Sequence, residues 1–221
     1  MFEVGLIRVL STEDKEILNS HGRIIEQNFP NMKVESLAIK DQPKGIYDDK
    51  TEEIAKAKII DLAKNNFSNK DVIIVSCAGD PALEELRKLM SIPIIGAGES
   101  AALLSKIYGN KVGIVGITRN LPKSYVKYIG KDVIGEPFIP NINNTTDLMK
   151  SDGLDKVLAH CENLKNKGAE VLVFACTGLS TTRFAPIIEK EIGLPVVDCV
   201  YAEAVFVNAV CLRNTFYNIK E

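Results

Sequence analysis

The feature that most constrains the fold of this chain is a short motif that occurs twice, about a hundred residues apart. The first copy is DVIIVSCAGDP, residues 71–81, and the second is EVLVFACTGL, residues 170–179. Each copy has an acidic residue, a run dominated by Val, Ile, Leu and Phe, a cysteine, a small residue and a glycine. A short apolar run bounded by polar residues is typical of a strand buried on both faces. The motifs therefore predict two central parallel strands with Cys77 and Cys176 at their carboxyl ends, where open α/β sheets bind ligands.

Two further pairs of segments repeat in the same order. Residues 111–118, KVGIVGIT, resemble the start of the chain, EVGLIRVLST, and GLPVVDCVYAEA near residue 200 resembles SIPIIGAGESA near residue 95. We therefore predict an α/β protein of two pseudo-symmetric parallel-sheet domains that face each other across a cleft. The first domain would comprise residues 1–97 plus about 200–221, and the second residues 98–199. The alternative is that every doubly wound fold repeats strand, glycine and helix.

Polar and turn-forming residues predict the connections between these strands. A hydroxyl cap at Ser11 predicts a helix that continues to about residue 29, and Asp80 is expected to cap the helix that follows Cys77. The polar segment 40–49 predicts a long loop on the same rim as Cys77, where it would line or cover a cleft. The segment 130–144, with two prolines and three asparagines, predicts a loop-rich connection.

Composition excludes several classes of function. The formal net charge of −2 over 221 residues provides no electrostatic attraction to nucleic acid or to an anionic membrane surface. We find no signal-peptide pattern and no apolar run of about 18 residues, so we expect a cytoplasmic protein. Five cysteines without a C-x-x-C spacing indicate free thiols in place of a disulfide framework. The two histidines are far apart, and His160 beside Cys161 in a helix would point in a different direction, so we expect no metal site.

The paired cysteines suggest acid/base chemistry at carbon. A thiol at a helix N-terminus is near the positive end of the peptide dipoles, so its pKa is expected to fall. A thiolate on one wall and a thiol on the other can remove a proton from one face of a carbon acid and return one to the opposite face. Backbone N–H groups at the two helix starts would stabilise the carbanion, namely those of Ala78, Gly79, Thr177 and Gly178. A lone cysteine is usually a packing residue, and this is our interpretation of the other three, Cys161, Cys199 and Cys211.

Over essentially its whole length the chain resembles the aspartate/glutamate/hydantoin racemase superfamily, in which two cysteines on two pseudo-symmetric domains perform cofactor-independent racemisation. Residues 77–109, CAGDPALEELRKLMSIPIIGAGESAALLSKIYG, look most like the hydantoin racemase branch. Residues 176–180, CTGLS, also fit that branch, because glutamate racemases carry Cys-Thr-His and this chain has Gly178 in place of that histidine. The chain departs from hydantoin racemases at residues 10–12, Leu-Ser-Thr in place of an Asn-Pro-Asn-type turn, and at Ala78, where many have a larger residue.

The resemblance implies a small-molecule racemase or epimerase that needs no cofactor, inverting a carbon next to a carbonyl in a 5-substituted hydantoin or an amino acid. It implies an acid/base pair, Cys77 and Cys176, and a substrate site formed by Ala78, Gly79, Thr118, Thr177 and Gly178. Ser11 and Glu99 are further candidates for substrate binding, although each also fits a helix terminus. We expect a homo-oligomer with no nucleic-acid or membrane partner.

Two alternatives stay open at this point. One is an enzyme of the same fold with another reaction, such as a maleate isomerase or an arylmalonate decarboxylase. The other is a non-catalytic two-lobed protein that binds a small molecule. A nucleotide enzyme is disfavoured, because Gly96-Ala97-Gly98 lacks the third glycine of a dinucleotide-binding turn and has Ala101 there.

Overall fold

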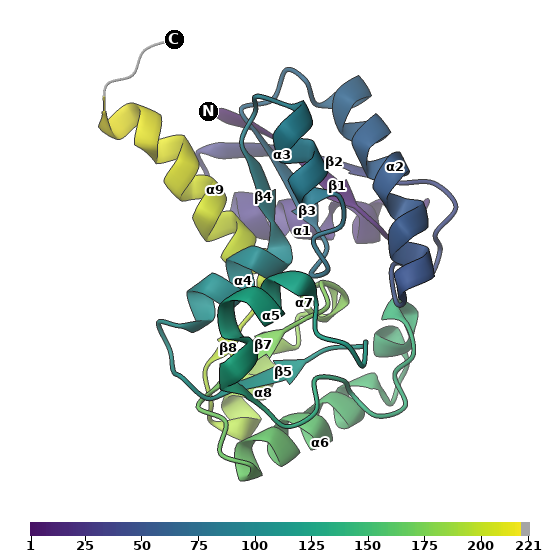
Figure 1. Cartoon of the computed structure of the whole chain (residues 1–221), viewed down its shortest axis with the longest axis vertical. Coiled ribbons are helices and arrows are strands. Elements are labelled where there is room, and N and C mark those ends of the chain that lie inside the picture. Colours follow the sequence, from purple (N-terminus) through teal and green to yellow (C-terminus); the bar gives the residue numbers. More distant parts are fainter. Residues whose placement is uncertain (218–221) are drawn as a thin grey trace.

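The computed structural model describes residues 1–217, apart from the side chain of Asn214, and shows two lobes that are each built on a four-stranded parallel sheet (Figure 1). In the first lobe the strand order is β2-β1-β3-β4, and in the second it is β6-β5-β7-β8. Adding four to each strand number of the first sheet gives the second sheet, so the two topologies are the same. This confirms the predicted α/β fold of two pseudo-symmetric parallel-sheet units. The strands are β1 (Phe2–Arg8), β2 (Met32–Ala38), β3 (Val72–Ser76), β4 (Ile94–Gly96), β5 (Val112–Val115), β6 (Val133–Ile134), β7 (Val171–Phe174) and β8 (Val196–Val197).

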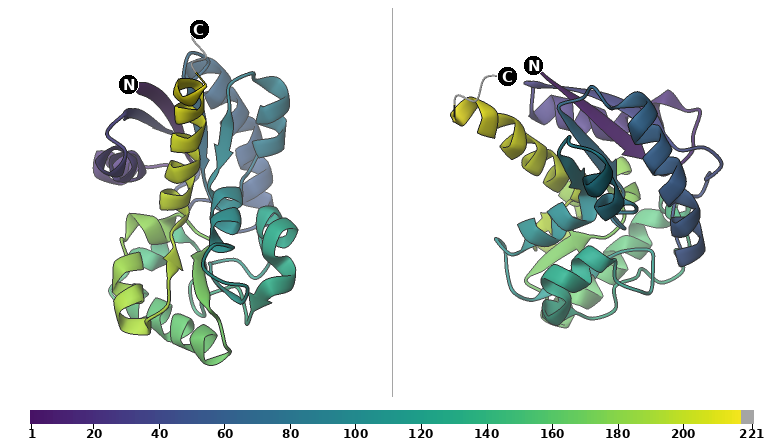
Figure 2. Two further views of the ribbon diagram at one scale, coloured as in Figure 1. Left: turned by 90° about the vertical axis from the view of Figure 1, so that its left-hand side faces the viewer. Right: turned by 45° about the horizontal axis from the view of Figure 1, so that its top comes forward.

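Helices cover the sheets and carry the chain between the lobes (Figure 2). The chain enters the second lobe through α4, directly after β4, and returns along the first lobe through α9, directly after β8. The domain boundaries predicted near residues 97 and 200 lie next to these crossings and stay a prediction. The α-helices are α1 (Lys15–Asn28), α2 (Asp49–Asn66), α3 (Leu83–Leu89), α4 (Ala97–Ser105), α5 (Lys123–Ile129), α6 (Gly153–Asn166), α7 (Gly178–Thr181), α8 (Ala185–Ile192) and α9 (Cys199–Phe216), with 3₁₀ turns η1 (Gly130–Asp132) and η2 (Thr145–Met149).

The apolar runs of the repeated motifs form the central strands, as predicted. All five residues of β3 and all four of β7 are buried, because helices pack against both faces of each sheet. In the first lobe Phe67 and Ile73 belong to the core on one face, and Ile74 and Val207 to the core on the other. The parallel register brings the carboxyl ends of β1 and β3 together, and equally those of β5 and β7. The residues that follow these strands are thus placed at one edge of each sheet.

Two predicted helix caps are wrong. Helix α1 begins at Lys15, where the carboxylate of Asp14 accepts hydrogen bonds from two backbone N–H groups of the first turn. The Ser11 hydroxyl instead donates to the carbonyl of Ile39 and accepts from the N–H of Gln42, so it fastens the loop after β2. Asp80 does not cap α3, which has no side-chain cap; its carboxylate accepts from the first-turn N–H groups of α4.

The segment 130–144 contains a strand that the sequence analysis missed. Residues Val133–Ile134 pair with β5 and form the edge of the second sheet. The strand is only two residues long, so its apolar pattern is too short to be distinguished from a loop.

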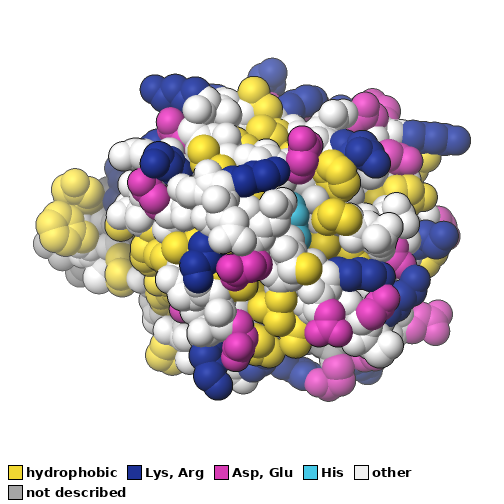
Figure 3. Space-filling model, turned by 90° about the horizontal axis from the view of Figure 1, so that it is seen from below, with side chains coloured by type: hydrophobic (Ala, Val, Ile, Leu, Met, Phe, Trp, Pro, Cys, Tyr) yellow, Lys and Arg dark blue, Asp and Glu magenta, His cyan; other side chains and the backbone are white. Residues whose placement is uncertain are grey.

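The surface of the described chain is mixed in character. Lysine and arginine side chains are interspersed with aspartate and glutamate over the face in Figure 3, without a large area of one sign. Among residues 1–217, no helix combines the length and the apolar composition that crossing a bilayer requires. The homo-oligomer stays a prediction.

Packing between β1 and the end of α2 provides a test of the fold. A Cβ atom on Gly5 would lie 2.5 Å from Cγ of Phe67, a fully buried ring. We expect Gly5→Ala to lower the free energy of unfolding by about 1–3 kcal/mol through overpacking, measured by denaturant unfolding. The control is Gly130→Ala, where the nearest atom is 3.8 Å away and the backbone is helical; its effect should stay within about 0.5 kcal/mol. Equal losses in both variants would contradict this packing.

Candidate active site

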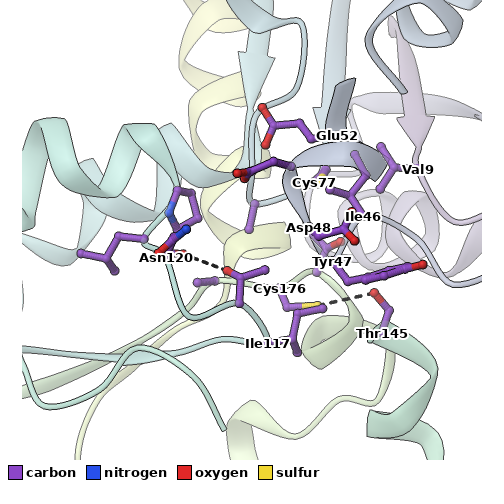
Figure 4. A pocket seen from close by; sticks show the side chains of 18 of the residues that line it. Val9, Ile46, Tyr47, Asp48, Glu52, Cys77, Ile117, Asn120, Thr145 and Cys176 are labelled. Carbon is purple, nitrogen blue, oxygen red and sulfur yellow. Dashed lines mark hydrogen bonds between the residues drawn. The ribbon is translucent and has the colours of Figure 1, made fainter. Parts of the chain in front are cut away.

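A cavity of about 380 Å³ opens between the lobes at the carboxyl ends of the central strands. Residues 77–79 after β3 and residues 175–177 after β7 line it from opposite sides, and Figure 4 shows Cys77 and Cys176 approaching it from different lobes. Both thiols are buried, with 9% and 8% of their surface exposed. Residues 46–49, from the loop after β2, and residues 117–123, after β5, complete the walls. The structure therefore brings together the two cysteines that the repeated motif singles out.

The loop that carries Cys77 is held in place by Asp80. Asp80 has a φ of 51°, in the left-handed region that non-glycine residues seldom adopt. Its carboxylate accepts hydrogen bonds from the N–H groups of Gly98 and Glu99 at 2.9 and 2.6 Å, and from the hydroxyl of Ser124 on α5. Burial raises the pKa of Asp80 to about 7, although these hydrogen bonds act in the opposite direction. The position of Cys77 thus depends on contacts with α4 and α5.

Several groups near the sulfur of Cys176 favour its thiolate. The hydroxyl oxygen of Thr145 lies 3.9 Å from the sulfur (Figure 4). The backbone N–H groups of Gly178 and Leu179 at the start of α7 lower the pKa of the thiol, and the N–H of Leu179 also donates to the carbonyl oxygen of Cys176. Thr145 packs against the glycine: a Cβ atom at Gly178 would lie 2.5 Å from its methyl group. Glycine at position 178 therefore allows Thr145 to approach the sulfur.

The expectation that the pKa of both thiols falls is wrong. Burial raises the pKa of Cys77 and of Cys176 above the ordinary thiol value, because a thiolate loses its hydration in this site. The opposing contributions are unequal. The N–H of Gly79 favours a thiolate at Cys77, where negative charge on Asp80 and Glu52 disfavours it. At Cys176 the N–H groups of Gly178 and Leu179, the hydroxyl of Thr145 and the guanidinium of Arg8 all favour the thiolate. Of the two, Cys176 is the better place for the negative charge.

Most of the predicted substrate-binding residues line the cavity, and three do not. Ala78, Gly79, Thr118 and Thr177 line it. Gly178 lies behind the sulfur of Cys176 and reaches it through its N–H. Ser11 is engaged with the loop after β2, as described above.

Glu99 is directed away from the cavity. Its carboxylate pairs with Arg87 and accepts a hydrogen bond from the hydroxyl of Tyr128. It borders a separate, smaller cavity of about 180 Å³. Neither Ser11 nor Glu99 therefore lines the site that holds the cysteines.

The 40–49 loop lines the cavity through Ile46 and Tyr47, in agreement with the prediction that this loop would line or cover a cleft. Sequence reasoning missed Thr145, which begins η2 after the second strand of the other sheet. The repeat contains a signal for Thr145, because adding the offset of about 100 residues to the 40–49 loop gives residues near 145. The two regions are also in contact: a Cβ atom on Gly45 would lie 3.0 Å from the hydroxyl oxygen of Thr145. Val9 and Ile117 occupy matching positions of the repeated segments 3–12 and 111–118, so the repeat also contains a signal for them, whereas the apolar wall residue Leu121 lies outside the repeat.

Most charged side chains of the lining are exposed at the rim of the cavity. Asp48 and Asp49 lie at the start of α2, and Arg119 and Lys123 follow β5 in the second lobe. The guanidinium of Arg119 stacks on the ring of Phe138 at 4.4 Å. The exception is the half-buried Glu52, whose negative charge acts on Cys77. Within residues 1–217, no group of three His, Cys, Asp or Glu side chains is arranged to hold a metal ion. The lining therefore has no buried cation.

Comparison with known proteins places the chain in a family. The model of the Asp/Glu/Hydantoin racemase family matches residues 11–207. A hydantoin racemase from Pseudomonas sp. (strain NS671) is 27% identical over 164 residues, which are 69% of this chain and 63% of that protein, so the match spans less than two thirds of the relative.

Solved structures of low sequence identity share the fold. The allantoin racemase from Klebsiella pneumoniae superimposes with a TM-score of 0.80 at 21% identity, over 97% of this chain and 89% of the other. The allantoin racemase from Pseudomonas fluorescens gives a TM-score of 0.81 at 16% identity, over 95% and 90%. Because the family model covers most of the sequence and the duplicated fold agrees with it, this protein belongs to the Asp/Glu/hydantoin racemase family.

Proposed function

We propose that this protein is a cofactor-independent racemase or epimerase that inverts a carbon next to a carbonyl group, with Cys77 and Cys176 as its acid/base pair. The observation that carries the proposal is the placement of two buried thiols, from equivalent positions of the duplicated lobes, on the walls of one cavity. A single thiol would exchange a proton on one face of a substrate carbon. Two thiols on opposite walls have access to both faces, which inversion requires.

In the proposed reaction Cys176 starts as the thiolate and Cys77 as the thiol. The Cys176 thiolate removes the proton from the substrate carbon, and the electron pair of the C–H bond moves onto the carbon and its neighbouring carbonyl. The Cys77 thiol then donates its proton to the opposite face and becomes the thiolate. The reverse direction uses the same steps with the roles exchanged. Ala78 and Thr177, directly after the cysteines, line the cavity and offer N–H groups to the oxygen that gains charge.

The wall chemistry favours an uncharged carbon acid as substrate. The only cations of the lining, Arg119 and Lys123, are exposed at the rim, and its other charged side chains, Asp48, Asp49 and the half-buried Glu52, are acidic. A dicarboxylate would lose its hydration here, find no buried cation on the cavity wall and be repelled by Glu52. A 5-substituted hydantoin is uncharged and is a stronger carbon acid than a free amino acid. Its substituent could pack against the apolar wall residues Val9, Ile46 and Leu121.

The two-thiol mechanism predicts a stereospecific defect in each cysteine variant. In deuterium oxide, Cys77→Ser and Cys176→Ser should each lose racemisation by roughly 10²-fold or more. The remaining thiol should still exchange the α-hydrogen of one enantiomer, and the two variants should prefer opposite enantiomers. NMR of the recovered substrate measures exchange, and polarimetry measures inversion.

The matched control is Cys211→Ala, which removes a buried cysteine of α9 that does not line the cavity. It should exchange and racemise like the unaltered protein. Absence of deuterium at the α-carbon of every hydantoin and amino acid tried with the unaltered protein would end the proposal.

The unequal surroundings of the thiols predict an order of chemical reactivity. Since thiolates react with iodoacetamide, Cys176 should be modified faster than Cys77 near pH 8, and both rates should still rise with pH above the ordinary thiol pKa, because burial raises the pKa of both thiols. Thr145→Val should slow Cys176 by about 3- to 10-fold, the loss of one hydrogen bond to the thiolate, and leave Cys77 unchanged. Peptide mass spectrometry measures both sites. Faster modification of Cys77 would contradict the assignment of Cys176 as the resting thiolate.

The charges of the cavity lining predict a preference among substrates. Racemisation of 5-substituted hydantoins should exceed that of aspartate and glutamate under the same conditions, as followed by circular dichroism. Glu52→Gln should lower KM for any anionic substrate and leave KM for hydantoins nearly unchanged, because it removes a negative charge from the half-buried wall. Efficient turnover of aspartate or glutamate by the unaltered protein would refute this choice of substrate.

A further inference from the structure

Behind the two cysteines, on the side away from the cavity, lies a network of buried polar side chains that the proposed reaction does not use. Its members come from five elements: Arg8 ends β1, His21 lies on α1, Ser76 ends β3, Thr181 lies on α7, and Glu203 lies on α9. Ser76 immediately precedes Cys77, and Thr177, whose carbonyl joins the network, immediately follows Cys176. The network therefore contacts the backbone of both cysteine loops.

Arg8 is a buried cation without an acidic partner. Only 4% of the residue is exposed. Its Nη1 donates to the carbonyls of Ile17 and Leu18 at 2.8 and 3.2 Å and to the hydroxyl of Ser20, and its Nη2 lies 3.4 Å from the hydroxyl of Thr181. Among the described residues, none of its nitrogens has a carboxylate oxygen within 4.0 Å. A buried charge of this kind is costly unless a negative charge lies near it.

Glu203 is the obvious counter-ion, so its protonation decides whether it balances Arg8. Its Oε1 accepts a hydrogen bond from the hydroxyl of Ser76 at 2.7 Å. The Ser76 oxygen lies 2.8 Å from Nδ1 of His21, and Nε2 of His21 lies 2.9 Å from the hydroxyl of Thr181 and 3.1 Å from the carbonyl of Thr177. A neutral carboxyl group and a carboxylate both satisfy these contacts, so the protonation of Glu203 is decided by its burial.

Burial indicates that Glu203 is neutral. Glu203 is fully buried, and its second oxygen, Oε2, has no hydrogen-bond partner. Burial raises the pKa of Glu203 well above its ordinary value. Burial and the nearby Arg8 hold the pKa of His21 well below its ordinary value, so His21 is neutral too. The charge of Arg8 is then left for another group to balance.

Apart from Arg8, the groups that face the thiols from the surrounding elements carry no positive charge. They are the neutral His21 of α1, Tyr125 of α5, and Cys199 and Glu203 of α9, together with the acidic Asp80, Asp198 and Glu52. The acidic members Asp80 and Glu52 act on Cys77. Arg8 acts on both cysteines, and an ionised Glu203 would act on it more strongly than either, so the neutral state of Glu203 is what leaves Arg8 to the thiols.

We propose that Arg8 is the buried counter-ion of the single negative charge that Cys176 and Cys77 exchange through the substrate. This inference rests on the proposed function for the exchange between the thiols. The total charge of the site is the same when Cys176 is the thiolate, when the substrate is the carbanion and when Cys77 is the thiolate. One fixed cation behind both cysteines therefore balances the negative charge in every step of the reaction. Arg8 touches no reacting atom and is a positioning residue that acts through its field.

The test separates the charge of Arg8 from its packing. Arg8→Gln removes the charge and keeps amide donors for the helix carbonyls, whereas Arg8→Lys keeps the charge. The readout is the pH dependence of iodoacetamide modification at Cys176, resolved by peptide mass spectrometry. Arg8→Gln should raise the apparent pKa of Cys176 by about one unit, a roughly tenfold slower reaction at pH 8, and Arg8→Lys should stay close to the unaltered protein.

Folded Arg8→Gln protein with an unchanged titration would overturn the proposal. The assay needs no substrate, so its outcome is independent of whether the protein racemises a hydantoin.

A second measurement keeps the test decisive if Arg8→Gln does not fold. The infrared spectrum of the unaltered protein at neutral pH should contain the carbonyl band of a protonated carboxyl group that is absent from Glu203→Gln. The same variant should leave the titration of Cys176 unchanged, because it replaces one neutral group by another. An ionised Glu203, or a lower apparent pKa of Cys176 in Glu203→Gln, would show that Glu203 balances Arg8 and would refute the proposal.

Discussion

The loss of water around two sulfur atoms is the constraint on which the rest of this site depends. Burial between the two lobes makes each thiolate unfavourable. The pKa of each thiol therefore depends strongly on nearby hydrogen-bond donors and positive charges. The hydroxyl of Thr145 and the backbone N–H groups after each cysteine lower the pKa of the thiols against the effect of burial. The same exclusion of water strengthens each of these contacts relative to its value at the surface. A dry cavity is also the setting in which a carbanion is protected from unselective protonation.

The symmetry of the fold does not extend to the charges around the cysteines. Both sheets have the same strand order and both cysteines follow the third strand, yet one sulfur faces acidic side chains and the other faces donors. A racemase must work in both directions, and its two bases need not have the same resting proton affinity for that. The duplicated scaffold provides matching positions, and the loops that differ between the lobes distinguish them.

The sequence predicted the parts of the structure that are encoded locally. Strands β3 and β7 follow from unbroken apolar runs, and their equivalence follows from the repeat, so both cysteines could be placed at strand ends. The partners of Ser11 and Asp80 could not be predicted, because Ile39, Gly98 and Ser124 come close only in the folded chain. The direction of the thiol pKa shifts was missed for a similar reason. The strand and the turn around each cysteine are visible in the sequence, whereas α3 begins only at Leu83, well after Cys77, and the depth at which each thiol is buried depends on the opposite lobe.

The contact between Gly178 and Thr145 has a consequence for how such sites diverge. A side chain at position 178 would collide with the threonine methyl, so the two positions cannot vary independently. In an evolving lineage, replacement of Thr145 by a smaller residue must precede or accompany any gain of a side chain at 178. This contact therefore restricts the order in which substitutions can occur. It also limits which related enzymes can be reached from this protein by single amino-acid substitutions.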